Sequence, residues 1–144
     1  MSIHFRVLQK PDYNKGFLQL LSQLSTVGPV SQEKFDKLFD KRESNPNVHT
    51  FVYEKNGKIA CSATLLVEDK YLHECSPAGH IEDVVVDKNE RKTGLGKKLI
   101  CHLIEEAKKN GCYKVILDCE DKNVKFYERC GLKKHGNEMS YYIK

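Results

Sequence analysis

Residues 79–110 read GHIEDVVVDKNERKTGLGKKLICHLIEEAKKN. The run at 81–86 is short and rich in β-branched apolar residues, which is typical of a buried strand. Further on, the spacing of the apolar residues is that of a helix. Leu95, Leu99 and Leu103 recur every fourth residue and form one apolar face. The stretch therefore predicts a strand, a tight loop and a helix.

A basic loop with two glycines separates this strand from the helix. It consists of Arg91, Lys92, Thr93, Gly94, Leu95 and Gly96. Glycine lets backbone N–H groups approach a ligand closely, and a helix N-terminus adds a partial positive charge. The loop therefore favours a phosphate or pyrophosphate site. A glycine-containing turn with a solvated basic face is the simpler alternative.

Two common nucleotide-binding motifs do not fit the loop. A Rossmann fingerprint needs a third glycine three residues after Gly96, where Leu99 stands. A P-loop needs four residues between its glycines, and here only Leu95 separates them. The pattern Arg-x-x-Gly-x-Gly instead resembles the pyrophosphate loop of the GNAT superfamily of acetyl-CoA-dependent N-acetyltransferases. GHIEDVVV before the loop and GCYKVILDCEDKNVKFYERCG at 111–131 strengthen the resemblance, which is weaker over the first half of the chain.

Strand and helix patterns alternate along the chain and predict an α/β fold with a mixed sheet covered by helices on both faces. We expect strands at 3–9, 50–55, 58–68, 81–86, 114–118 and 134–143, and helices at 13–24, 31–41, 95–110 and 123–130. Asn56-Gly57 between the second and third strands predicts a tight hairpin turn. The resemblance implies the GNAT acyl-CoA N-acyltransferase fold, whose central strands splay apart to admit the pantetheine arm of acetyl-CoA.

Composition favours one globular domain spanning residues 1–144, with 40% hydrophobic and 31% charged residues. The net charge of +4 is mild, so it permits a small anionic ligand without indicating nucleic acid. No apolar run approaches the roughly 20 residues that span a bilayer, and the first residues lack the layout of a secretory signal. We therefore expect a cytoplasmic protein with no membrane partner.

The six cysteines form no C-x-x-C pair and no cysteine–histidine cluster with zinc-ligand spacing. We therefore expect reduced, structural cysteines and no metal. Cys101 within the central helix and Cys119 after a strand suit small apolar fillers.

Acetyl transfer from a thioester to an amine requires a bound cofactor, a polarised carbonyl, a neutral amine and a stabilised thiolate. The resemblance implies three catalytic residues, Glu82, Asp118 and Tyr127. Asp118 would bind and activate the amine, and Tyr127 would stabilise the departing thiolate. Alternatively, Asp118 is an ordinary surface charge or a helix cap. Tyr127 could likewise be an ordinary aromatic residue of the core. Glu82 and Asp83 are consecutive strand residues, so one of them should face inward. The alternative is that one faces solvent and the other pairs with a lysine.

The resemblance also implies the binding residues. Acetyl-CoA would contact Glu82, Asp83, Val84, Arg91, Lys92, Thr93, Gly94, Leu95, Gly96, Asn123 and Tyr127. The amine substrate, expected to be glucosamine 6-phosphate, would contact Ser25, Lys70, His73, Glu82, Asp83 and Asp118. The family often holds the phosphate with an arginine near the C-terminus, whereas Tyr142 stands near that position and carries no charge at neutral pH. A homodimer with C-terminal segments at the interface is implied as well.

The implied reaction is direct attack of the amine within a ternary complex, which yields N-acetylglucosamine 6-phosphate. The same fold could acetylate a polyamine, another amino sugar or a protein lysine. A basic nucleic-acid-binding module is a further alternative, but the lysines lack interleaved aromatics and no helix-turn-helix pattern is present. The last alternative is a protein that binds acyl-CoA as a sensor without catalysis. The presence of both Asp118 and Tyr127 argues against it.

Overall fold

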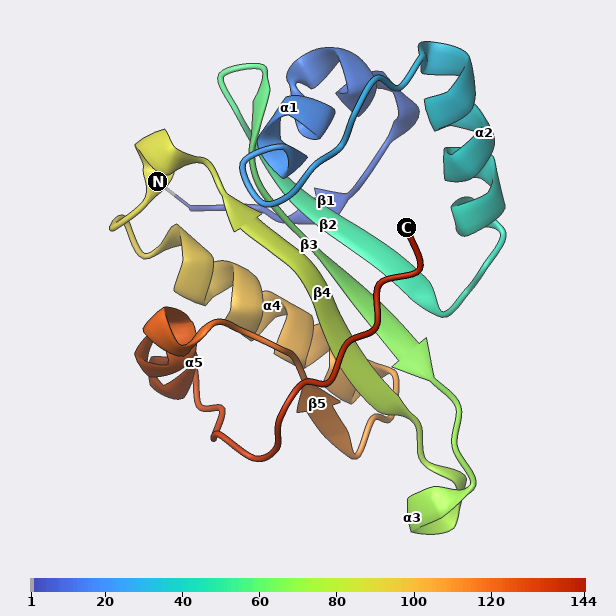
Figure 1. Cartoon of the computed structure of the whole chain (residues 1–144), viewed down its shortest axis with the longest axis vertical. Helices are drawn as coiled ribbons and strands as arrows, with labels where there is room; N and C mark the ends of the chain where they lie inside the picture. The colour runs from blue at the N-terminus through green and yellow to red at the C-terminus, as the bar shows by residue number, and fades with distance from the viewer. Residues whose placement is uncertain (1) are drawn as a thin grey trace.

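The computed structural model describes residues 2–144, and these contain a mixed five-stranded sheet in the order β1-β2-β3-β4-β5. The strands are β1 (Arg6–Val7), β2 (Val48–Lys55), β3 (Lys58–Glu68), β4 (Ala78–Val86) and β5 (Lys114–Ile116). Neighbours are antiparallel from β1 to β4, and β5 runs parallel to β4 (Figure 1). The prediction of a mixed sheet is confirmed.

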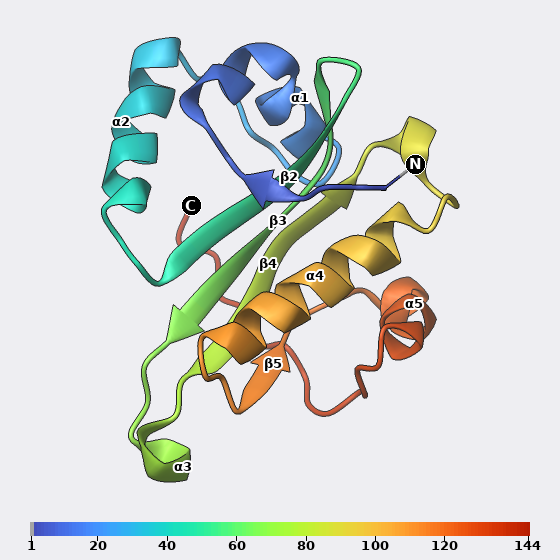
Figure 2. The same cartoon turned by 180° about the vertical axis from the view of Figure 1, so that it is seen from behind.

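Helices cover both faces of this sheet. The α-helices are α1 (Phe17–Leu21), α2 (Gln32–Glu43), α3 (Leu72–Cys75), α4 (Leu95–Lys109) and α5 (Val124–Arg129), and the 3-10 turns are η1 (Lys10–Lys15), η2 (Lys88–Glu90) and η3 (Asp121–Asn123). α4 crosses one face, whereas α1 and α2 lie on the other (Figures 1 and 2). No helix within residues 2–144 has the length and apolar character needed to cross a bilayer.

The apolar face of α4 forms the centre of the larger core. Leu99, Ile100 and Leu103 are completely buried, and they pack against Leu65 and other residues of β3. Each fully buried aliphatic side chain contributes about 2 kcal/mol relative to an exposed one. α4 is therefore fixed on the sheet, and its N-terminus is held at one end of β4.

Two local signals in the sequence have the predicted structures. Asn56 and Gly57 both have positive φ, at 52° and 78°, and join β2 to β3 as a tight hairpin. Ser31 caps α2, because its hydroxyl accepts a hydrogen bond from the Lys34 backbone N–H at 3.1 Å.

A partly buried cluster of ion pairs connects β1 to the segment that precedes α1. The carboxylate of Asp12 is fully buried and accepts two hydrogen bonds from Arg6, at 2.8 and 2.9 Å. Glu54 on β2 accepts further bonds from Arg6 and Lys15. The guanidinium of Arg6 and the Gln9 backbone N–H outweigh the effect of burial and lower the pKa of Asp12. This cluster sets where α1 begins.

Several predicted elements differ from the structure. The helix predicted at 13–24 is divided at Gly16, which has φ 77° and separates η1 from α1. The strand predicted at 114–118 ends at Ile116, and the helix predicted at 123–130 begins only at Val124, because Asn123 is the last residue of η3. The strand predicted at 134–143 is absent, because this segment has no strand partner within residues 2–144. Its side chains Met139, Tyr141, Tyr142 and Ile143 are almost fully exposed.

All six cysteines are free thiols, although not all of them fill the core. Cys61 is completely buried, and burial raises its pKa to about 12. Cys101 and Cys119 are exposed, so the prediction that they act as apolar fillers is wrong. Cys101 lies on α4 outside the apolar face formed by Leu99, Ile100 and Leu103.

Candidate active site

β4 and β5, the last two strands of the sheet, separate soon after they meet. They pair only at Ala78–Lys114, Gly79–Val115 and His80–Ile116. The packing around Gly79 in this short pairing is tight, because an added Cβ would lie 3.2 Å from a methyl carbon of Leu65. Beyond it, residues 81–86 of β4 have no strand partner on the β5 side. This short pairing agrees with the implied splay, and it leaves a free backbone edge along residues 81–86 of β4.

β4 carries a bulge on its other edge, where it pairs with β3. Ser62 lies opposite Val85 and Thr64 opposite Glu82, so two residues of β4 face one residue of β3. Asp83 takes up the extra length with a positive φ of 52°. The expectation that Glu82 or Asp83 faces inward is not met, because the bulge breaks the alternation and both residues are exposed.

Three carboxylates gather beside this bulge. The pKa of Glu82 is raised, first by partial desolvation and then by the negative charges of Asp83 and Asp118. Asp118 follows the end of β5, so it comes from the other side of the splay. Clustered carboxylates attract an ammonium group and can accept its proton. The structure thus brings together the three acidic residues predicted from the sequence.

The loop at 91–96 has the geometry of an anion site. Lys92 and Gly94 both have positive φ, at 65° and 83°, and Gly94 is the N-cap of α4. The Thr93 hydroxyl donates to the Glu90 carbonyl at 2.7 Å, which closes the loop. Nothing lies within 4 Å of the position that a Cβ on Gly94 would occupy. Backbone N–H groups at the start of α4 therefore face open space, as the binding of an anion requires.

The side chains of this loop differ in whether they can contact a bound anion. Lys92, Lys97 and Lys98 are exposed and available to a ligand. Arg91 is exposed as well, but its Nε donates to the Val86 carbonyl at 3.2 Å and so joins the loop to the end of β4. Leu95 is buried, so it can offer a ligand only its backbone N–H.

Tyr127 lies on α5 and packs, partly buried, against the larger core. Burial, followed by the nearby thiols of Cys119 and Cys130, raises its pKa to about 12, so the phenol keeps its proton at neutral pH. Phe126 packs edge-on against Tyr127, with ring centroids 4.9 Å apart. Asn123 is exposed and precedes α5 as its N-cap. A protonated, largely desolvated phenol is suited to donate a hydrogen bond or a proton to a leaving thiolate.

The loop between α1 and α2, which carries Ser25, is held beside the loop that follows β4. The backbone N–H of Lys88 donates to the Gln23 side-chain oxygen at 3.0 Å, and the Gln23 amide lies 3.5 Å from Asp87. At the other end, the Tyr13 hydroxyl donates to the Val30 carbonyl at 2.8 Å. Ser25 itself is exposed.

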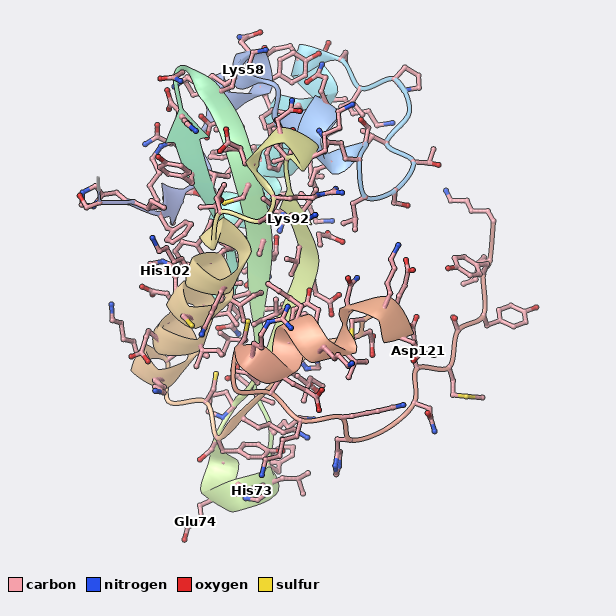
Figure 3. The ribbon with its side chains drawn as sticks, turned by 90° about the vertical axis from the view of Figure 1, so that its left-hand side faces the viewer. Lys58, His73, Glu74, Lys92, His102 and Asp121 are labelled. Atoms are coloured by element: carbon pink, nitrogen blue, oxygen red, sulfur yellow. The ribbon has the colours of Figure 1, made fainter. Side chains whose placement is uncertain are left out.

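Lys70 and His73 are not brought to the same place as Ser25. They lie at or near α3, at the tip between β3 and β4, whereas α1 lies at the opposite end of the sheet (Figures 1 and 3). Lys70 donates to Glu68 at 3.2 Å, and the His73 ring stacks on Tyr113 with centroids 3.9 Å apart. Within one chain, the predicted substrate residues therefore form two separate groups.

Two polar residues near the site were missed from the sequence. Gln23 joins the α1–α2 loop to the loop after β4, and Arg42 on α2 reaches the hydroxyls of Thr50 and Thr64. Both are polar residues of helical or turn segments, a pattern that sequence alone does not distinguish from a solvated face. Residues 2–144 contain no group of three or more histidine, cysteine, aspartate or glutamate side chains arranged to hold a metal ion.

Comparison with known proteins assigns the fold. Residues 15–132 match the model of the Acetyltransferase (GNAT) family. The chain is 44% identical to glucosamine 6-phosphate N-acetyltransferases from Arabidopsis thaliana and Candida albicans, over 96% and 94% of this chain and 95% and 92% of theirs. The crystal structure of the Arabidopsis enzyme superposes with a TM-score of 0.96 at 42% identity and covers 100% of both chains.

The splayed strands, the anion loop and these similarities define an acetyl-CoA-dependent N-acetyltransferase of the GNAT class. This chain belongs to the GNAT family. The fold and the cofactor implied by the sequence are therefore confirmed.

Proposed function

We propose that this protein transfers the acetyl group of acetyl-CoA to the amine of D-glucosamine 6-phosphate. The products are N-acetyl-D-glucosamine 6-phosphate and CoA, a step toward UDP-N-acetylglucosamine. The observation that carries the proposal is the similarity to relatives that bear this name, which is 44% identity over nearly the whole chain and a TM-score of 0.96. The three carboxylates beside the splay support it, because the substrate presents an ammonium group.

Acetyl-CoA supplies a thioester whose carbonyl carbon accepts the amine. The loop at 91–96 holds its pyrophosphate with backbone N–H groups and with the positive end of α4. The free edge of β4 at 81–86 offers main-chain donors and acceptors to the pantetheine arm, and Asn123 lies at the start of α5 beside it. A backbone N–H of β4 polarises the thioester carbonyl, as a preorganised donor does without a charged side chain.

The carboxylates prepare the amine. Asp118 binds the ammonium and orients it toward the acetyl group, and Glu82 and Asp83 add negative charge on the opposite side. The raised pKa of Glu82 makes it a better proton acceptor than an ordinary glutamate, because a more basic carboxylate takes a proton more readily. The neutral amine then attacks directly within the ternary complex, so no acyl-enzyme forms.

Tyr127 completes the reaction. When the C–S bond breaks, the electron pair stays on sulfur, and the Tyr127 hydroxyl donates a hydrogen bond to the thiolate. The second proton that the attacking nitrogen loses then neutralises the thiolate to give free CoA thiol. The buried phenol holds its proton up to a pH of about 12, so it is always available as a donor in the physiological range.

The proposed enzyme is a cytoplasmic homodimer with one domain, residues 1–144, in each subunit. Two observations support the dimer. The C-terminal segment exposes Met139, Tyr141, Tyr142 and Ile143 and stands away from the sheet (Figure 3). Lys70 and His73 lie far from Ser25 in the same chain, so they could complete the substrate site of the second subunit. An exposed apolar segment of this kind is typical of an interaction site.

The test is release of free CoA thiol from acetyl-CoA with glucosamine 6-phosphate, run beside glucosamine, spermidine and a lysine peptide. We expect rapid release with the sugar phosphate alone. Faster release with another amine would assign a different acceptor to the same cofactor site, and no release with any amine would contradict catalysis. Light scattering of the same preparation measures the mass, and a single-chain mass at assay concentration would contradict the dimer.

A further inference from the structure

The loop between α1 and α2, residues 22–31, begins close to β4 (Figure 1). Phe17 and Leu20 of α1 pack in one buried cluster with Val85, which follows the bulge of β4. The loop therefore leaves α1 near the strand that carries two of the three clustered carboxylates. It also carries Ser25, which is predicted to contact the acceptor. We call residues 22–31 the acceptor loop.

Packing contributes little to the position of the acceptor loop. An open pocket of about 570 Å³ lies between the loop and the segment of η1 and α1, and both segments line it. Within residues 2–144, the backbone N–H groups of Thr26, Val27 and Gly28 have no hydrogen-bond partner. The Tyr13 hydroxyl donates to the Val30 carbonyl at 2.8 Å, but this contact holds only the end of the loop next to α2. The position of the other end depends on a second polar contact.

Gln23 supplies that contact, two residues before Ser25. Its side-chain oxygen Oε1 accepts a hydrogen bond from the backbone N–H of Lys88 at 3.0 Å. Its Nε2 lies 3.5 Å from Oδ1 of Asp87. A side-chain amide both accepts and donates hydrogen bonds, so one glutamine contacts two consecutive residues of the connection between β4 and α4. The acceptor loop is thereby joined to residues that lie 64 and 65 positions further along the chain.

The connection between β4 and α4 is held in place without Gln23. The Asp87 backbone N–H donates to the Ala60 carbonyl at 2.8 Å, which fixes the connection to β3. Lys55 at the end of β2 pairs with Glu90 of η2 at 3.0 Å. The same connection leads directly into the anion loop at 91–96. Gln23 therefore joins a loosely packed loop to the fixed support of the cofactor site.

We propose that Gln23 is a positioning residue that holds the acceptor loop at a fixed place relative to the anion loop. The proposal rests on the proposed function, because it concerns the acceptor of that reaction. When the contact with Lys88 is lost, the acceptor loop moves more freely, and binding of the acceptor must order it again. Affinity for the acceptor then falls. Affinity for acetyl-CoA stays the same, because other contacts hold the connection that supports the anion loop.

Two variants remove the same hydrogen bond from opposite sides. Gln23→Met keeps the length of the side chain but removes the amide. Lys88→Pro removes the N–H at the first residue of η2, where proline is tolerated, and Asp87 already has the ψ of 133° that suits a residue before proline. We expect each variant to raise the KM for the acceptor roughly 3- to 10-fold, as the loss of one hydrogen bond predicts. The double variant should show no further rise, because both changes remove one contact.

Two control variants separate this contact from other effects of the substitutions. Lys88→Ala removes the exposed side chain but keeps the backbone N–H. Gln32→Met removes an amide that donates to Asp36 at 2.8 Å within α2 and so joins no other element. Both controls should have the KM of the wild type. The Kd for CoA, measured by calorimetry, and the temperature of thermal unfolding should be close to those of the wild type in all variants.

The KM is measured for whichever amine the wild type acetylates fastest, so that a different acceptor would change the proposed function without affecting this test. An unchanged KM in Gln23→Met and Lys88→Pro would overturn the role of Gln23 while the proposed function stands. Effects that multiply in the double variant would also overturn it, because the two residues would then act separately. Equal losses of affinity for CoA and for the acceptor would indicate a purely structural role and contradict the proposal. If the wild type acetylates no amine, both proposals are overturned.

Discussion

The ring of Phe126 occupies the space that a side chain on Gly96 would need. A Cβ built on Gly96 lies 3.1 Å from Cζ of Phe126 and 3.6 Å from a methyl carbon of Val86. Gly96 is therefore required for packing between α4 and α5 as well as for access to the cofactor loop. Since Tyr127 follows Phe126, this contact also sets the position of the proposed thiolate donor.

Gly96→Ala tests this relationship. Alanine would normally stabilise a helix relative to glycine by about 1 kcal/mol. Here the methyl group must displace Phe126 by a few tenths of an ångström, so we expect lower kcat without a matching gain in the free energy of unfolding. Steady-state kinetics and thermal unfolding check this. Gly136→Ala, in open space in the C-terminal segment, is the control, and an unchanged kcat for Gly96→Ala would contradict the coupling.

Gly94→Val should weaken binding of acetyl-CoA. Gly94 has φ 83°, which strains a β-branched residue by about 1–3 kcal/mol, and the new side chain would fill the open space above the loop. We expect a roughly 10-fold or larger rise in the Kd for CoA, measured by calorimetry. Gly111→Val is a matched control, because Gly111 has φ 77°, equally open surroundings and a place beyond the other end of α4. Equal CoA affinity for the two variants would argue against the pyrophosphate loop.

Tyr127→Phe removes the proposed donor while retaining the ring. We expect kcat to fall roughly 100-fold, with little change in the Kd for acetyl-CoA. Because the pKa of Tyr127 is raised to about 12, kcat of the wild type should show no loss from its ionisation at neutral or mildly alkaline pH. Tyr53→Phe, on β2 where the ring packs against Phe5, is the control. If Tyr127→Phe has the kcat of the wild type, Tyr127 does not act as the donor to the thiolate.

Asp118→Asn keeps the size of the side chain but removes its charge. We expect kcat/KM for the amine to fall roughly 10- to 100-fold, because a charge-assisted contact to the ammonium is lost. The pKa of Glu82 should fall, since the charge of Asp118 helps to raise it, and the acid limb of the pH profile should move to lower pH. Asp121→Asn in the neighbouring turn should leave both quantities unchanged. If the acid limb of the pH profile does not move, the charge of Asp118 does not influence Glu82, and the proposed carboxylate cluster is contradicted.

Asp12→Asn tests the buried charges beneath α1. Removing one partner of a buried ion pair costs about 3 kcal/mol in the free energy of unfolding. The folded pKa of Asp12 is lowered, so its stabilisation is complete above the unfolded value of about 3.9 and is lost as pH falls through the folded pKa. The difference between wild type and variant in chemical denaturation should therefore be full at pH 7 and shrink in acid. Asp40→Asn, in an exposed pair with Lys10, should cost little at either pH.

Local signals in the sequence predicted most of the fold. The leucines of α4 and the Asn56-Gly57 turn depend on nearby residues alone, so their patterns were sufficient. The bulge at Asp83 could not be predicted, because it depends on the register between β4 and β3. The C-terminal segment was predicted as a strand, but pairing needs a neighbouring strand that residues 2–144 do not provide.

The candidate site was predictable where one short stretch contains its residues. The loop at 91–96 carries its own signal, because its glycines and cations are adjacent. Asp118 and Glu82 come together only through the sheet, and their proximity was expected from the family resemblance alone. The contacts of Arg42 with Thr50 and Thr64 were missed because they depend on how α2 packs against β2 and β3, which leaves no trace in the sequence of α2.

The unpaired edge of β4 affects how freely this part of the sequence can change. Main-chain groups recognise a ligand in the same way whichever side chains they carry, so substitutions at 81–86 that preserve the backbone path retain that recognition. Proline is the exception, because it lacks an N–H. A saturation-mutagenesis scan of the strand would therefore separate two kinds of constraint. Core positions such as Ile81 and Val85 would reject polar residues. Outside Glu82 and Asp83, whose carboxylates have proposed roles, positions whose N–H faces the gap would mainly reject proline.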